Sequence, residues 1–165
     1  MPSAENHDHY MRIAIDLACG QIGRKEARPF GAVIVKDGEI LGSGCNRAVL
    51  DNDPTAHAEI VAIRDACRKL QSHRLDGSVI YSSCEPCPMC LSAIYWAGIK
   101  KLYFGCSSQT AEQYGFGDSA LYRELYAPSQ SRQVKSVQLL EHEALRPFKE
   151  WTTAGGTPSI VADWK

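Results

Sequence analysis

Two short stretches of the chain contain the residue types that could perform chemistry, residues 55–59 (Thr-Ala-His-Ala-Glu) and residues 83–90 (Ser-Cys-Glu-Pro-Cys-Pro-Met-Cys). Cys87 and Cys90 have Cys-x-x-Cys spacing, and with His57 they supply three ligands of the kind that a tetrahedral zinc ion takes. Three protein ligands leave a fourth position for water. The pattern therefore predicts a catalytic zinc site and not a closed structural one.

Glu59 follows the histidine by two residues. Residues two apart in a helix point in different directions, so Glu59 is not expected to bind the same ion as His57 and can carry protons instead. His-x-Glu followed by Pro-Cys-x-x-Cys, here completed by residues 86–90, is typical of zinc nucleobase deaminases. In that chemistry a zinc-bound hydroxide attacks an amino-bearing ring carbon, and ammonia leaves.

Other interpretations of these residues are weaker. Cys84 could complete a closed Cys₃His structural site, and the protein would then be a zinc-stabilised interaction module without turnover. The position of Glu59 argues against this, and Cys84 is predicted to be a buried neighbour. A redox Cys-x-x-Cys would leave His57 and Glu59 without roles. The other histidines are expected to be surface or hydrogen-bonded residues: His7, His9, His73 and His142.

Composition predicts a single soluble domain. The chain has 165 residues, of which 44% are hydrophobic and 22% are charged. Its 18 basic and 19 acidic residues form no long basic run, which disfavours a nucleic-acid partner. We find no signal-like N-terminus and no apolar run of membrane-spanning length, so no membrane association is expected. The seven cysteines, three within residues 84–90 and the rest scattered, are not typical of a secreted disulfide framework, and we expect a cytoplasmic protein with reduced thiols.

Hydrophobic periodicity and turn residues predict the element order α-β-β-α-β-α-β-α, which is typical of a three-layer α/β protein. Both site helices should begin on the same side of the sheet. The expected elements are a helix capped by Ser3 and ending near Gly20, strands 32–35 and 39–44 joined by an Asp-Gly turn, a helix from Thr55, strand 79–81, a helix from Pro86 to Gly98, strand 101–105, helix 120–126, a last strand or extended arm over 134–140, and helix 143–153.

Four motifs carry a resemblance to the cytidine deaminase-like superfamily, and within it to the bacterial guanine deaminase family. The resemblance covers nearly the whole chain. It implies a three-layer α-β-α fold with a mixed five-stranded central sheet and one domain over residues 1–165. The third motif, followed by the fourth, is similar specifically to the guanine branch. The motifs are residues 29–38, 52–59, 83–90 and 93–97.

The resemblance also implies roles for individual residues. His57, Cys87 and Cys90 match the zinc ligands, with one ion per subunit, and Glu59 matches the catalytic glutamate. A carboxylate in the pocket suits guanine, whose N1–H and exocyclic amine are donors. Five positions match residues that hold the base: Phe30 by stacking, Asn46 by hydrogen bonding, Trp96 as a pocket wall, Asp118 as the acidic contact, and Ala58.

Near the C-terminus, Glu143 matches a second functional carboxylate, with Glu141 as a nearby competitor, and Trp164 is the candidate aromatic that seals the pocket. The resemblance implies a homodimer in which residues from about 128 to 165 exchange between subunits. It also implies hydrolysis of guanine to xanthine and ammonia. Guanosine is the strongest alternative substrate, and cytosine, ammeline or tRNA adenosine are weaker ones.

Overall fold

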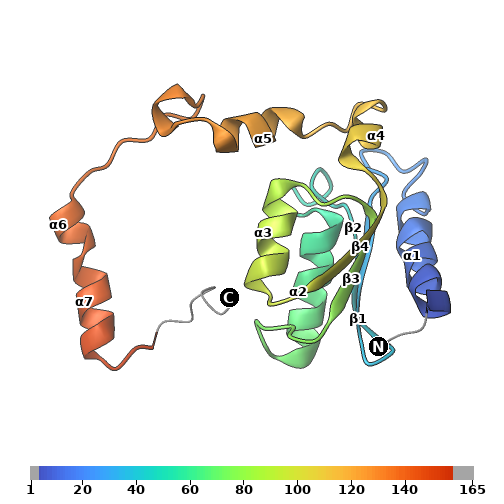
Figure 1. The fold of residues 1–165 in the computed structure, drawn as a ribbon, viewed down its shortest axis with the longest axis horizontal. Helices are drawn as coiled ribbons and strands as arrows, with labels where there is room; N and C mark the ends of the chain where they lie inside the picture. Colours follow the sequence, from blue (N-terminus) through green and yellow to red (C-terminus); the bar gives the residue numbers. More distant parts are fainter. Residues whose placement is uncertain (1–3, 158–165) are drawn as a thin grey trace. The chain divides into compact units, whose positions relative to one another are not determined.

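The computed structural model describes residues 4–157 of the chain (Figure 1), which form two units, one up to Ser119 and one from Ala120 onward. The first unit contains a four-stranded sheet of order β2-β1-β3-β4, in which β1 is antiparallel to both neighbours and β3 is parallel to β4. The strands are β1 (Gly31–Lys36), β2 (Glu39–Cys45), β3 (Val79–Cys84) and β4 (Lys101–Cys106).

The first two strands form the predicted hairpin. Asp37 and Gly38 both have positive φ angles, 50° and 86°, as a two-residue turn of type I′ requires. The tight turn sets β2 beside β1 with Cys45 opposite Gly31, so that Asn46, the residue after β2, returns to the level of Phe30. The backbone N–H of Asn46 donates to the carbonyl of Phe30 over 3.1 Å. The hairpin therefore places Phe30 and Asn46, two predicted substrate contacts, next to each other.

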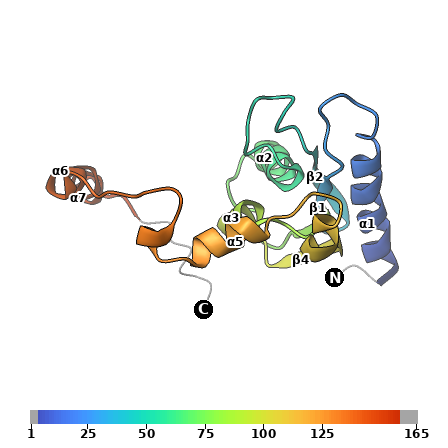
Figure 2. The same cartoon turned by 90° about the horizontal axis from the view of Figure 1, so that it is seen from above.

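Helices cover both faces of the sheet, which confirms the three-layer architecture (Figures 1 and 2). Side chains alternate along β1: Val33 and Val35 pack with α1 (Ala4–Cys19), whereas Ala32 and Ile34 pack with the helices of the other face. Ser3, the predicted cap of α1, lies outside the described residues. The helices of the second face are α2 (Ala58–Leu70) and α3 (Pro88–Trp96).

Helix α2 packs directly on the backbone of β2. A Cβ atom added to Gly44 would lie 2.4 Å from the carbonyl oxygen of Ala58, and one added to Gly42 would lie 2.4 Å from that of Ala62. Both approaches are far shorter than van der Waals contact, so only glycine allows the helix to lie this close. The glycines therefore set the depth at which the N-terminus of α2 lies over the sheet.

The expected fifth strand is wrong for the described part of the chain, where the sheet has four strands. Residues 134–140 form no strand there, and their apolar side chains are exposed, with Val134 and Val137 each 78% exposed. Extended chain becomes a strand only when a neighbour pairs with its N–H and C=O groups. Residues 135–140 have no regular secondary structure, and Leu140 has a left-handed backbone (φ 52°, ψ 40°).

The remaining helices are short. α4 (Ser108–Glu112) was not predicted and begins where the Ser107 hydroxyl accepts the N–H of Thr110. The single helix expected over 143–153 is divided at Leu145, because the first turn of the second part holds Pro147, which has no N–H to donate to the preceding turn. The second unit contains α5 (Ser119–Tyr126, which begins at the last residue of the first), the 3₁₀ turn η1 (Ser129–Ser131), α6 (Glu141–Ala144) and α7 (Arg146–Thr153).

Within the described range, no helix combines the length and hydropathy needed to cross a bilayer.

Candidate active site

The candidate metal ligands lie where the N-termini of α2 and α3 meet. His57 is the N-cap residue of α2, whose first residue, Ala58, lies three residues after the predicted start at Thr55, and Cys87 is the N-cap residue of α3. Cys90 lies in the first turn of α3, which Pro88 opens because its fixed φ angle suits a first helical position. The positive ends of two helix dipoles therefore face the thiols, which favours their thiolate forms.

The distances among these side chains fit a zinc ion. His57 Nδ1 lies 3.6 Å from Cys87 Sγ and 3.5 Å from Cys90 Sγ. Nitrogen and sulfur ligands at ordinary zinc bond lengths and tetrahedral angles lie about 3.6 Å apart. Among residues 4–157, these three form the group that could hold a metal ion, with all ligand atoms within 4.8 Å of one another. The donor set and its spacing fit a zinc site that keeps one position for water.

The two thiols are coupled. A hydrogen bond from Cys90, together with the neighbouring His57, lowers the pKa of the Cys87 thiol to about 4, and the same hydrogen bond raises the pKa of Cys90. Cys87 therefore loses its proton more readily than Cys90. Because zinc binds thiolates, metal binding would release the protons that these thiols still hold.

Cys84 lies apart from these ligands. It is not in the three-residue group that could hold a metal ion, and 8% of its surface is exposed. This agrees with a buried neighbour and not with a fourth ligand. Burial raises the pKa of its thiol to about 11.

Glu59 is buried beside the metal ligands, with 7% of its surface exposed. The hydroxyl of Ser82 donates a hydrogen bond of 3.0 Å to Glu59 Oε1, and burial raises the pKa of the carboxyl. Ser82 shares a face of β3 with Ile80, the face that packs on α2, so strand alternation directs its hydroxyl toward the site. A desolvated carboxyl that accepts the Ser82 hydroxyl is suited to accepting and returning a proton.

A cavity of about 190 Å³ joins the predicted metal ligands to predicted substrate contacts. Phe30, Asn46 and Asp118 line it together with His57 and Glu59. Phe30 meets the ring of Phe116 edge to face, with centroids 5.2 Å apart. The cavity therefore has an aromatic wall beside the catalytic groups. Its other lining residues are Arg28, Cys84, Glu85, Cys87, Ser108, Gly115, Phe116 and Gly117.

The polar groups of the cavity are held in defined orientations. Asn46 Oδ1 accepts the N–H of Ala48 at 3.2 Å, which leaves the amide NH₂ of Asn46 as a donor for a ligand. Ser108 connects two carboxylates: its hydroxyl lies 2.5 Å from Asp118 Oδ1, and its backbone N–H donates to Glu85 Oε2 over 2.9 Å. One donor and two carboxylate acceptors thus converge on the cavity.

Three predicted contacts are not among the residues that line this cavity. Ala58 is completely buried at the start of α2, and Trp96, the last residue of α3, is 63% exposed. Glu143 belongs to the second unit, in α6, where it is exposed. The roles of these residues stay predictions. Trp164 lies outside the described residues.

Several residues of the site were not predicted. Glu85 stands inside the cysteine motif, which was the available signal for it. Ser82 is two residues after Ile80 and therefore lies on the same face of β3. This signal could not be used, because the predicted strand ended at residue 81, whereas β3 runs to Cys84. Ser108 gave no signal, because nothing in its neighbours indicates that its hydroxyl meets Asp118. The others, Arg28 and Phe116, lie in loops without periodicity.

Comparison with known proteins agrees with this chemistry. The zinc-binding region of cytidine and deoxycytidylate deaminases matches residues 4–106, which contain all three metal ligands and Glu59. The chain belongs to this deaminase family. Zinc is accordingly the cofactor of this deaminase, with His57, Cys87 and Cys90 as its candidate ligands, and the protein is a zinc-dependent hydrolase.

Relatives of this deaminase include a guanine deaminase from Bacillus subtilis, 45% identical over 146 residues that cover 88% of this chain and 94% of the relative. A tRNA-specific adenosine deaminase from Agrobacterium fabrum is 43% identical over 59% of this chain and 63% of its own length. Among solved structures, the B. subtilis guanine deaminase superposes with a TM-score of 0.88 at 42% identity, over 93% of this chain and 99% of that one. A guanine deaminase from Nitrosomonas europaea gives 0.64 at 26% identity, over 93% and 86% of the two chains.

Proposed function

We propose that this protein hydrolyses guanine to xanthine and ammonia. The observation that carries the proposal is the cavity in which His57, Cys87 and Glu59 meet two further carboxylates and an amide donor. Guanine presents the complementary groups, with donors at N1 and the exocyclic amine and acceptors at O6 and N7. The near full-length similarity to a guanine deaminase supports the same substrate.

The chain's own residues account for the proton transfers. When bound, zinc lowers the pKa of a bound water to about 7 and so supplies the nucleophile for guanine C2. Glu59 accepts the proton that this water gives up and passes it to the ring nitrogen beside C2. It then takes the proton of the new hydroxyl at C2 and delivers it to the amino group, so that the C2=O bond forms as the C2–N bond breaks and ammonia leaves. Ser82 keeps the carboxylate of Glu59 directed at the reacting atoms throughout.

Recognition of the base is assigned to the other end of the cavity. The NH₂ of Asn46 donates to a purine acceptor, and Asp118, whose Oδ1 already accepts the Ser108 hydroxyl, accepts an N–H of the base through its other oxygen. The ring of Phe30 stacks on the base, and Phe116 supports Phe30 from its edge. These contacts orient guanine with C2 toward the zinc ligands.

Guanosine is the second candidate substrate, because the same base contacts would serve a nucleoside. The cavity volume of about 190 Å³ favours the bare base, since sites for larger organic ligands usually measure about 300–1,000 Å³. Ammonia release by the zinc-loaded protein on guanine and guanosine side by side, with cytosine and adenine as controls, tests the choice. Turnover of guanine alone is expected. If only guanosine is turned over, the substrate is the nucleoside and not the base. If none of the four compounds is turned over, the result supports the alternative of a zinc-stabilised interaction module.

We also propose that the protein is a homodimer whose segment from about residue 128 to 165 exchanges between subunits and brings Glu143 to the partner's site, while Trp96 contributes to the pocket wall. In support, the described part of this segment exposes large apolar side chains, among them Leu140 and Phe148, each 70% exposed. Such surface favours burial against a partner. All seven cysteines are free thiols, which suits a cytoplasmic location.

Mixed dimers test the exchange. A dimer that combines an Asp118→Ala subunit with a Glu143→Ala subunit should recover activity that neither variant has alone, because one of its two sites then holds both intact residues. Light scattering should show two chains per particle. A monomer with full activity would contradict the exchange.

A further inference from the structure

Three polar residues of the active-site cavity form a chain of hydrogen bonds. The backbone N–H of Ser108 donates to Glu85 Oε2 over 2.9 Å, and the Ser108 hydroxyl donates to Asp118 Oδ1 over 2.5 Å. All three residues line the cavity and belong to the first unit. Glu85 comes from the cysteine motif and Asp118 from the loop after α4. Ser108 therefore joins the segment that carries two metal ligands to the segment assigned to the base.

Glu85 is held at the ends of two paired strands. It directly follows β3, and its backbone N–H donates to the carbonyl of Cys106, the last residue of β4, over 2.8 Å. The parallel register of these strands places Cys84 opposite Cys106. The sheet thus sets the position of the backbone from which the Glu85 carboxylate reaches Ser108.

Ser108 is the first residue of α4. The N–H groups in the first turn of a helix have no partner within the helix, and Glu85 supplies one for Ser108. The preceding residue, Ser107, is the N-cap residue, and its hydroxyl accepts the N–H of Thr110 over 3.1 Å. Two side chains therefore hold the first turn of α4, and the Ser108 hydroxyl is attached to a backbone that both of them fix.

Asp118 lies in less regular surroundings. Residues 113–118 form a turn and a loop between α4 and α5, and Gly115 has a φ angle of 85°. A carboxylate on such a loop can take several orientations, and ordering it costs conformational entropy. The Ser108 hydroxyl selects one orientation by holding Oδ1. The other oxygen of Asp118 then has a defined direction in which to accept an N–H of the base.

We propose that Ser108 is a positioning residue for base recognition: its backbone is held by Glu85, and its hydroxyl orients Asp118 before the substrate binds. This role rests on the proposed function, because it takes Asp118 as a contact of guanine. A polar group that is oriented in advance removes an ordering cost from binding. The effect concerns binding of the base and not proton transfer by Glu59, so it belongs in KM and not in kcat.

Steady-state kinetics on guanine test this role. In Ser108→Ala, KM should rise about tenfold while kcat changes less than about threefold, because the lost contact orients the base. Ser108→Thr, which keeps a hydroxyl, should recover most of the loss. Ser107→Ala is the matched control, since its hydroxyl caps α4 and does not line the cavity. It should change KM less than about twofold even where it lowers the melting temperature.

Binding without turnover separates this role from the proposed deamination. Hypoxanthine keeps the ring N–H groups, O6 and N7 of guanine but has no amino group to lose, so calorimetry on the zinc-loaded protein gives its Kd directly. The Kd should rise about tenfold in Ser108→Ala. In protein that already carries Asp118→Ala, adding Ser108→Ala should change the Kd less than about twofold, because the group that the hydroxyl orients is absent.

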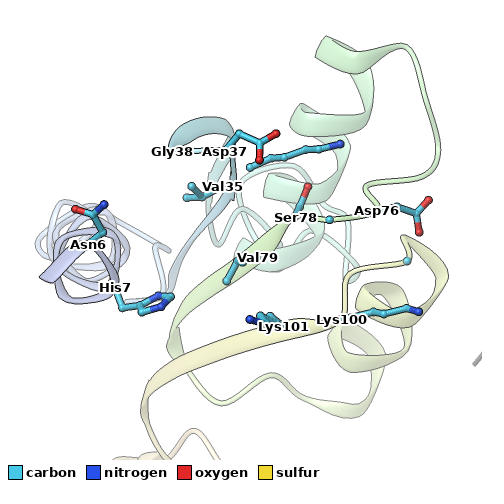
Figure 3. Close-up of a pocket in the computed structure, with 13 residues that line it drawn as sticks. Asn6, His7, Val35, Asp37, Gly38, Asp76, Ser78, Val79, Lys100 and Lys101 are labelled. Carbon is cyan, nitrogen blue, oxygen red and sulfur yellow. The ribbon is translucent and has the colours of Figure 1, made fainter. Parts of the chain in front are cut away.

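Variants of Glu85 test the other end of the chain of hydrogen bonds. Glu85→Ala should raise the Kd for hypoxanthine as Ser108→Ala does. Glu85→Gln should stay near the unmodified protein, because its amide oxygen can still accept the Ser108 N–H. Asp37→Asn makes the same change from carboxylate to amide in the hairpin turn (Figure 3), beside a cavity that shares no lining residue with the active site, and should have no effect.

The outcomes distinguish this role from the proposed function. Normal turnover of guanine with unchanged KM and Kd in Ser108→Ala would overturn the role of Ser108 alone. An equal rise of KM in Ser107→Ala, or full additivity with Asp118→Ala, would also overturn it. If guanine is not turned over but Ser108→Ala still weakens hypoxanthine tenfold, deamination of guanine is wrong and the role of Ser108 stands. If guanine is not turned over and hypoxanthine does not bind, both are wrong.

Discussion

Glu59 owes its proposed role to its surroundings as much as to its place in the sequence. A carboxyl next to a zinc site could bind the metal, but Glu59 lies outside the three-ligand group and is held instead by the Ser82 hydroxyl. Burial raises the pKa of Glu59, so its carboxyl takes up a proton more readily than it would in water. This is the property that a group needs if it is to accept and return a proton in each cycle.

Replacement of Glu59 tests that role. In Glu59→Ala, zinc and fold should remain while deamination falls by roughly 10²- to 10⁴-fold, the usual contribution of a positioned general acid–base. Ammonia release and zinc content are measured on the same samples. Glu59→Gln, which keeps the shape of the side chain, should be as inactive. Turnover near that of the unmodified protein, with zinc bound, would refute the mechanism.

Ser82 is a positioning residue in this scheme. In Ser82→Ala, kcat should fall about tenfold or more with little change in KM, because a hydrogen bond to a charged group contributes about 1.5–3 kcal/mol and this one does not face the base. Steady-state kinetics on guanine measure the effect, and Ser82→Thr should recover most of it. Ser83→Ala is the matched control, since its hydroxyl accepts the Gly31 N–H instead. Equal losses in both alanine variants would indicate a structural role.

Sequence reasoning at this scale succeeded where chemistry depends on local spacing. Cys87 and Cys90 are three residues apart in the first turn of one helix, so their common direction follows from helix geometry. It did not find Ser108, whose hydroxyl reaches Asp118 ten residues later across a short helix and a loop. No periodic pattern connects such residues, and only the folded loop brings them together.

At the scale of elements, the contact between β2 and α2 controls the position of the metal site. The glycines of β2 let α2 lie against the backbone, and α2 begins at the residue after His57. A displacement of the helix would therefore move one zinc ligand relative to the two on α3. The sequence predicted that both site helices begin on the same side of the sheet. The depth at which α2 packs could not be read from periodicity, because it depends on which strand residue faces which turn of the helix.

A methyl group at Gly44 tests this dependence. In Gly44→Ala, the new Cβ would lie 2.4 Å from the Ala58 carbonyl oxygen, so α2 must shift, and the free energy of unfolding should fall by about 1–3 kcal/mol with weaker zinc binding. Denaturant titration and zinc competition measure the two effects. Gly20→Ala, whose Cβ would make an ordinary 3.4 Å contact, should stay within about 0.5 kcal/mol. Unchanged zinc affinity in Gly44→Ala would contradict the coupling.

The expected fifth strand depends on how secondary-structure elements pair with one another. Hydrophobic residues in 134–140 indicated extended backbone, but β2 and β4 are the edges of the sheet in the described chain, and this segment pairs with neither. The residue pattern of a segment indicates which secondary structure it can form, whereas strand pairing depends on which other segments lie beside it. Exchange of a segment between subunits likewise depends on the surface of a second chain and not only on the residue pattern of the segment itself.

At the scale of the whole molecule, the zinc site connects two helices that the chain reaches through different loops, and it should therefore stabilise the first unit against unfolding. At free zinc about 100 times the Kd, this linkage contributes about 2.7 kcal/mol. A chelator should lower the melting temperature of the protein accordingly, as measured by calorimetry.

Variants of the ligands provide the control for this measurement. Cys87→Ala and His57→Ala should lack zinc and should not respond to the chelator, whereas Cys84→Ala should keep both zinc and the response. Full zinc occupancy in Cys87→Ala and His57→Ala would show that the ligand set is wrong.

The family match includes the catalytic part of the active site but not all of the part assigned to base recognition, and this division indicates how the substrate could change. The matched region ends at residue 106, after every metal ligand and Glu59 but before Ser108 and Asp118. The bond-breaking groups thus belong to the inherited common part, and the carboxylate assigned to the base follows it in a loop. Loops tolerate replacement better than the elements they join. Exchange of residues 107–118 between relatives is therefore a compact route by which one catalytic framework could acquire a different ring as its substrate.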